Sequence, residues 1–249
     1  MHTSYTTTFA LWFLPLIAVA SVGLYYLLKN KSLKLQLIPF FAIALVVVVG
    51  EIFKQIFAFN QPSYDMFFVP LHISSIPIFS FALCLVFKQG SQISRIFWSL
   101  SLNAGCIISL LVVFYPTIIF GDAARELLTN AHWLDFGTFI SLHSIVVHYL
   151  YVMFVVLIFL FRPFKIVKRD ILFVIGIFVL FVALAAIVAT VTQTDFMRIL
   201  TSPVPFLESL GKTSLILMQL GTFVFYLVGF SIFAFGLYPI FKDKGDNKR

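Results

Sequence analysis

Residues 37–59 read LIPFFAIALVVVVGEIFKQIFAF, an almost unbroken apolar run that is interrupted late by Glu51, Lys54 and Gln55. A helix that crosses a bilayer needs about 20 mainly apolar residues, and lipid forces each backbone polar group to be satisfied within the segment. The run is too long and too continuous for a barrel strand, which alternates over about 10 residues. The stretch therefore predicts a membrane-spanning helix.

Further apolar stretches of this kind lie along the whole chain. With the first, they predict an all-α polytopic membrane protein with seven transmembrane helices, folded as a single domain over residues 1–249. The predicted spans are 9–28, 37–59, 67–87, 96–120, 136–161, 171–191 and 214–241.

The composition excludes soluble classes. Hydrophobic residues make up 61% of the chain and charged residues 11%, against about 45–50% and about 25% in soluble domains. A soluble Rossmann enzyme, a β-sandwich and a zinc-finger module are therefore excluded. Cys84 and Cys106 both lie inside apolar runs, so we expect no disulfide framework and no metal cluster. We also expect no cofactor.

The basic residues predict the direction of the chain. Thirteen of the 17 lysines and arginines fall on the connections after the first, third and fifth spans and on the C-terminal tail. The positive-inside rule then puts the N-terminus outside and the C-terminus in the cytoplasm of a cell-membrane protein. The net charge of +7 is thus expected to face anionic lipid headgroups rather than nucleic acid. Membrane lipids are the expected partners, and the oligomeric state stays open.

Polar side chains inside spans are costly, and so they indicate function. Glu51, Lys54 and Gln55 share one helix face, which predicts an internal ion pair or hydrogen bond. The alternative is that Lys54 extends to the membrane surface and Glu51 follows it.

Three histidines accompany serines in the predicted spans. His72 and Ser74 open the third span, and His143, Ser144 and His148 lie in the fifth. A histidine beside a serine in a dry cavity can activate the hydroxyl for acyl transfer, so these five residues are the candidate catalytic groups. Each histidine could instead bond a nearby carbonyl, and each serine the preceding turn.

Most of the polar residues fall in the predicted outer half of the membrane. The sequence thus predicts one polar cavity below the outer surface, in which side chains from separate spans meet. Glu51, Asn103, Arg198 and Gln219 are the candidate substrate-binding residues.

Several short motifs add a resemblance that spans nearly the whole chain. They are Glu51 late in the second span, VPLHIS at 69–74, His143 or His148 in the fifth span, Arg-Pro at 162–163, Met197, Leu200, Pro203, and Leu-Gly at 210–211. In this order the motifs resemble the YwaF-like family of bacterial seven-span integral membrane proteins.

The resemblance implies a distant similarity to eukaryotic membrane proteins that move or hydrolyse acyl chains on lipids. The acyltransferase branch of those proteins is thought to use a cysteine in a Pro-Cys-His motif, whereas this chain has Leu71 between Pro70 and His72.

The sequence therefore favours a lipid-modifying protein that carries out acyl transfer or ester hydrolysis, although it leaves enzyme activity undecided. The alternatives are a transporter or channel that uses intramembrane Glu and His, or a non-catalytic heptahelical binding protein.

Overall fold

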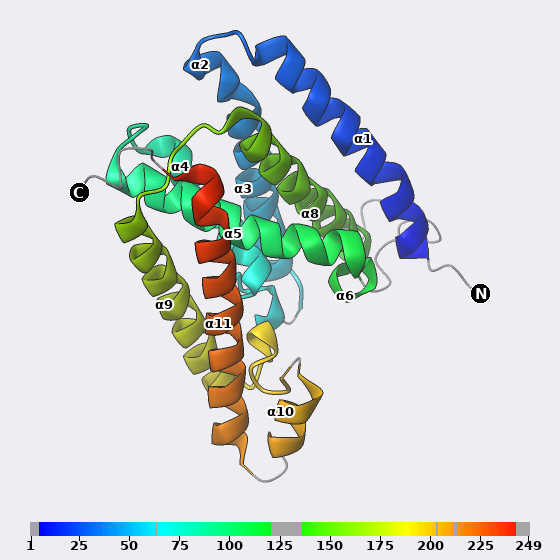
Figure 1. Ribbon diagram of the computed structural model, residues 1–249. Helices are drawn as coiled ribbons and strands as arrows, with labels where there is room; N and C mark the ends of the chain where they lie inside the picture. The colour runs from blue at the N-terminus through cyan, green and yellow to red at the C-terminus, as the bar shows by residue number, and fades with distance from the viewer. Residues whose placement is uncertain (1–4, 63, 121–135, 203, 212–213, 243–249) are drawn as a thin grey trace.

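A computed structural model describes residues 5–62, 64–120, 136–202, 204–211 and 214–242 (Figure 1). The first half contains α1 (Tyr5–Leu28), α2 (Leu33–Gln36), α3 (Ile38–Phe59), the 3₁₀ turns η1 (Met66–Phe68) and η2 (Ile73–Ser75), and α4 (Ile76–Val86). The second half contains α5 (Gln92–Phe114), α6 (Pro116–Phe120), α8 (Phe136–Phe161), α9 (Lys168–Thr192), the 3₁₀ turn η3 (Phe196–Arg198), α10 (Pro205–Gly211) and α11 (Leu215–Phe241). Over these residues the fold is helical, with a single isolated β-bridge between Ile166 and Lys242.

The apolar helices coincide with the predicted spans. Among the described residues, 5 helical stretches are long and apolar enough to cross a membrane: Leu33–Phe59, Gln92–Phe114, Gly137–Phe161, Lys168–Thr192 and Leu215–Phe241. Two shorter apolar helices, Trp12–Leu28 and Ile73–Val86, fall in the remaining two predicted windows. The all-helical membrane architecture is therefore confirmed, while the number of seven spans and their direction stay predictions.

The third predicted span, 67–87, is wrong as a continuous helix. The chain makes η1, passes through a non-helical stretch, makes η2 and only then enters α4, which has 11 residues. Val69 has φ −59° and ψ 132°, the extended conformation that a following proline favours in the residue before it. At 1.5 Å per residue, α4 covers about half of a hydrocarbon core of about 30 Å.

The fourth predicted span, 96–120, is also interrupted by a proline. Tyr115 leaves the helical region with φ −135° and ψ 53°, directly before Pro116. The long helix α5 therefore ends at Phe114, and α6 continues separately from Pro116.

Helix α5 lies at the centre of the bundle and is the most buried of the long apolar helices. It packs against α4 and α8 on one side and against α9 and α11 on the other (Figure 1). Gly105 permits a close approach to α8, since a Cβ there would lie 2.6 Å from Cγ2 of Val155. Small residues at such crossings are typical of membrane helices.

Two hydrophobic clusters fill the core on either side of α5. One includes Phe40, Phe81, Trp98 and Phe154, where the rings of Phe81 and Phe154 stack with centroids 3.6 Å apart. The other joins α9 to α11. Together they fix the rotation of α3, α8, α9 and α11 about the central helix.

A partly buried ion pair ties the beginnings of α5 and α9 together. Arg95 Nε lies 2.8 Å from Oδ2 of Asp170, and Arg95 Nη2 lies 3.4 Å from Oδ1. The Asp170 side chain has no exposed surface. Two parallel bonds of this kind define the geometry of the contact more strictly than a single bond would.

Candidate functional site

The polar cluster begins on the last part of α3. Lys54 Nζ lies 2.7 Å from Oε1 of Glu51, and Gln55 Nε2 donates to the same oxygen over 2.7 Å. The predicted pairing along one helix face is confirmed. The Lys54 side chain is only 15% exposed, so it stays with Glu51 inside the bundle instead of extending to the surface.

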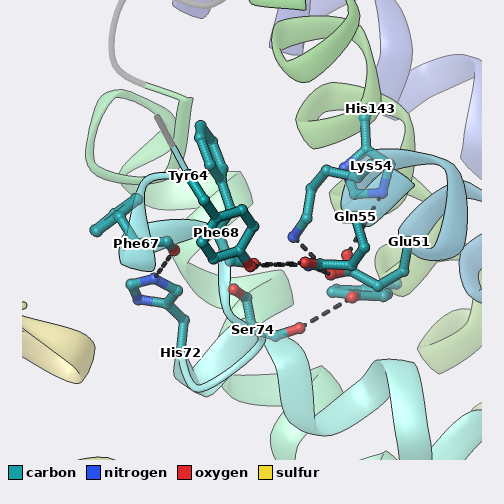
Figure 2. Close-up of polar contacts among 10 residues, drawn as sticks. Glu51, Lys54, Gln55, Tyr64, Phe67, Phe68, His72, Ser74 and His143 are labelled. Atoms are coloured by element: carbon teal, nitrogen blue, oxygen red, sulfur yellow. Dashed lines mark hydrogen bonds and ion pairs between the residues drawn. The ribbon is translucent and has the colours of Figure 1, made fainter. Parts of the chain in front are cut away.

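Gln55 also fixes the segment that leads into α4. Its Nε2 donates to the carbonyl oxygen of Phe68 over 2.7 Å, and the hydroxyl of Tyr64 donates to Gln55 Oε1 over 2.9 Å (Figure 2). Burial, followed by the Glu51 and Asp65 carboxylates, raises the pKa of Tyr64, so its hydroxyl remains a donor. The non-helical backbone before α4 is thereby held against α3.

His143 on α8 faces Glu51 across the α3–α8 interface. Its Nε2 lies 3.7 Å from Oε2 of Glu51, which is too long for a hydrogen bond. Both atoms are buried, and neither has a hydrogen-bond partner among the described residues. Gly50 lies directly behind the ring, since a Cβ there would be 3.3 Å from Cδ2 of His143. A buried acceptor and a buried ring nitrogen are thus held opposite each other and left unsatisfied.

His72 does not join this pair, which corrects the prediction of one pocket containing all three groups. Its Nε2 bonds the carbonyl oxygen of Phe67 at 3.0 Å, and its ring packs against Phe67 and Phe196. Figure 2 shows the His72 ring turned away from Glu51. The cause is the break before α4, because His72 sits in extended backbone with φ −82° and ψ 158°. The alternative of a histidine bonded to a nearby carbonyl is confirmed here.

His148 and the two candidate serines are also engaged through backbone groups. His148 Nδ1 bonds the carbonyl oxygen of Ser144 at 2.7 Å, and the Tyr151 hydroxyl donates to the carbonyl oxygen of Ser74 over 2.9 Å. Within the described part of the chain, no hydrogen bond joins the hydroxyl of Ser74 or Ser144 to a histidine. A serine nucleophile stays a prediction without a contact that supports it.

The remaining candidate residues lie apart from the Glu51–His143 pair. Asn103 on α5 donates to the carbonyl oxygen of Ser99 over 2.7 Å, and its own Oδ1 is buried without a partner. Arg198 is exposed in η3, and its φ of 53° is left-handed. Gln219 on α11 has a buried Nε2 without a described partner. Their predicted role in substrate binding is untested.

Two tyrosines of the cluster were missed from the sequence. Tyr151 follows Ser144 and His148 at helical spacing on α8, so extending that stripe by one turn would have found it. Tyr64 lies in a short connection, and no sequence pattern indicates that it bonds Gln55. Among the described residues, no group of three or more His, Cys, Asp or Glu side chains is placed to hold a metal ion.

The fold and the cluster define a class: a helical, multi-pass membrane protein with a buried carboxylate–histidine pair between two of its helices. Comparison with known families assigns the chain further. The TMEM164 family model matches residues 2–241, so the chain belongs to the TMEM164 family. The YwaF-like resemblance stays a prediction. No curated protein and no solved structure matches the chain.

Proposed function

We propose that this protein is a lipid-modifying membrane enzyme in which His143 acts as a general base on acyl esters and Glu51 orients it. The observation that carries the proposal is the buried separation of 3.7 Å between His143 Nε2 and Glu51 Oε2, with both atoms unsatisfied. Catalytic hydrogen bonds are often long before substrate binds and tighten in the complex. Buried unsatisfied polar groups are uncommon in proteins, and function is one reason that they persist.

The position of the pair agrees with a lipid substrate. We propose seven spans, with the N-terminus outside and the C-terminus in the cytoplasm of the cell. In this arrangement Glu51 lies about two turns before the outer end of α3 at Phe59. The ester groups of membrane lipids lie near the boundary of the hydrocarbon region, about two helical turns from Glu51. Membrane lipids are therefore the proposed partners.

The chemistry follows from the placement of the carboxylate. Glu51 faces Nε2, so it favours the tautomer that carries the proton there and leaves Nδ1 as the base. Nδ1 takes the proton of an attacking hydroxyl, and the oxygen of this hydroxyl forms a bond to the carbonyl carbon of the ester. When the ester C–O bond breaks, the carbonyl re-forms and the leaving oxygen takes the proton from His143. Glu51 stabilises the imidazolium that exists between these two steps.

This route needs no serine nucleophile, which agrees with the finding that no described hydrogen bond joins the hydroxyl of Ser74 or Ser144 to a histidine. Water as the attacking group gives hydrolysis, and a lipid hydroxyl gives acyl transfer. The Lys54 ammonium, 2.7 Å from Glu51 Oε1, compensates the buried carboxylate charge.

The test is acyl release or transfer by the purified protein with a phospholipid carrying a labelled acyl chain. We expect His143→Ala to lower turnover by about a hundredfold or more. Leu142→Ala truncates the neighbouring side chain on the same helix and should retain turnover. Unchanged turnover in the His143 variant would remove this residue from the mechanism.

A second function, proton or ion transport, is favoured by one observation. The backbone between η1 and η2 is non-helical beside the buried Glu51, and irregular backbone in a membrane bundle is tolerated where it lines a site or cavity. In proteoliposomes loaded with a pH-sensitive dye, this function predicts flux that is lost in Glu51→Gln. Flux without any ester turnover would favour transport over the enzyme.

A further inference from the structure

An apolar groove lies between the end of α1, the turn α2, the first half of α3 and the middle of α8. It encloses about 550 Å³, within the range of about 300–1,000 Å³ of small-ligand sites. The residues that line it are Leu24, Leu27, Leu28, Leu35, Ile38, Pro39, Ala42, Ile43, Val46, Leu150 and Met153. Every one of these side chains is apolar, so the groove suits a hydrocarbon chain and offers no polar contact along its length.

Three lysines lie next to lining residues at one end of the groove and form a basic rim. Lys29 directly follows the lining residue Leu28, Lys34 directly precedes the lining residue Leu35, and Lys31 lies between them. All three lysines are exposed, and none has an ion-pair partner among the described residues. The Lys29 ammonium lies over the ring of Tyr26, 4.4 Å from its centroid, so it must swing from this ring to contact a phosphate. No acidic residue occurs between Lys29 and Glu51. Among the described residues, the rim is therefore a positive charge without an ion-pair partner beside an apolar groove.

A side-chain clamp holds the rim in place. Gln36 Nε2 lies 3.1 Å from the carbonyl oxygen of Lys29 and 3.1 Å from that of Lys31. The amide thus satisfies carbonyl groups of the turn that follows α1. The three lysines are presented on an ordered turn rather than on a loose linker.

We propose that this groove binds one anionic phospholipid, with an acyl chain along α1, α3 and α8 and the phosphate at Lys29, Lys31 and Lys34. The apolar lining recognises the chain, and the three lysines recognise the negative headgroup, since each basic residue near a membrane surface favours anionic lipid. The site is separate from the Glu51–His143 pair and does not depend on the proposed activity.

The test uses purified protein in detergent with an equimolar mixture of phosphatidylglycerol and phosphatidylcholine, and native mass spectrometry to count the bound lipid. We expect about a tenfold preference for phosphatidylglycerol. The variant K29Q/K31Q/K34Q should lose this preference. The matched control K242Q/K244Q/K248Q removes three lysines from the C-terminal tail and should keep it.

A second pair of variants tests the groove itself. Ala42→Trp places a large ring in the groove and should lower retention of both lipids. Leu45→Trp adds the same ring at a position that is 65% exposed and outside the groove, so it should retain lipid. The thermal midpoint of each variant in the same detergent verifies folding.

Photoreactive phosphatidylglycerol with a diazirine in its acyl chain locates the bound lipid. Crosslinks on residues 24–28 and 38–46 support the proposal, and crosslinks confined to other helices overturn it. Equal retention of both lipids by the wild type, or full retention in Ala42→Trp, also overturns it. So does a stable dimer in which a second copy of the chain fills the groove.

Discussion

Nε2 of His143 on α8 lies 3.7 Å from Oε2 of Glu51 on α3, and no described residue satisfies either atom. The other carboxylate oxygen, in contrast, accepts from Gln55 and pairs with Lys54. One side of the carboxylate is therefore fixed by its own helix, and the other is directed at the histidine.

Gly50→Ala should lower ester turnover without unfolding the protein. The added Cβ would lie 3.3 Å from His143 Cδ2, so the ring has to move by a few tenths of an ångström. A misplacement near 1 Å costs about a hundredfold in rate, and we expect about a tenfold loss here. Gly176→Ala is the control, because nothing lies within 4 Å of its Cβ. Equal turnover in the two variants would show that the ring position is not critical.

Lys54→Met should destabilise the protein by about 3–5 kcal/mol, because it leaves the buried Glu51 carboxylate without its ammonium partner. The double variant Glu51→Gln/Lys54→Met removes both charges and should recover most of the thermal midpoint in detergent. It should nevertheless stay inactive, because the carboxylate that orients His143 is gone. A double variant that is both stable and fully active would contradict the role given to Glu51.

Gln55→Leu should loosen the segment before α4. The change leaves the Phe68 carbonyl and the Tyr64 hydroxyl without their partner, at a cost of about 1–3 kcal/mol. Hydrogen exchange of residues 64–69 should become faster, while exchange in α9 stays the same. Tyr64→Phe removes only one of these bonds and should show a smaller effect of the same kind. If exchange is unchanged in both variants, the segment is held by other contacts.

Gly105→Ala should destabilise the contact between α5 and α8. Its Cβ would approach Val155 Cγ2 to 2.6 Å, and the stiff valine side chain cannot turn away. Overpacking of this kind costs about 1–3 kcal/mol. The double variant Gly105→Ala/Val155→Ala should recover part of this loss, as a double-mutant cycle of thermal midpoints would reveal. Purely additive effects would show that the two residues do not compete for the same space.

The sequence by itself determined the features that depend on neighbours along the chain. The long apolar helices end close to where hydropathy predicts, as α3 does at Phe59 and α8 at Phe161. The contact of Glu51 with Lys54 and Gln55 also followed from spacing, because three or four residues bring side chains together on any helix.

Only the tertiary structure decided which helices present their polar residues to each other. The rotation of α3 against α8, set by packing around α5, brings Glu51 to His143, while the break after Val69 turns His72 towards Phe196. Arg95 and Asp170 meet for the same reason, although both lie on predicted connections. Helical periodicity fixes the angle between side chains on one helix, but it contains no information on how two helices are rotated against each other.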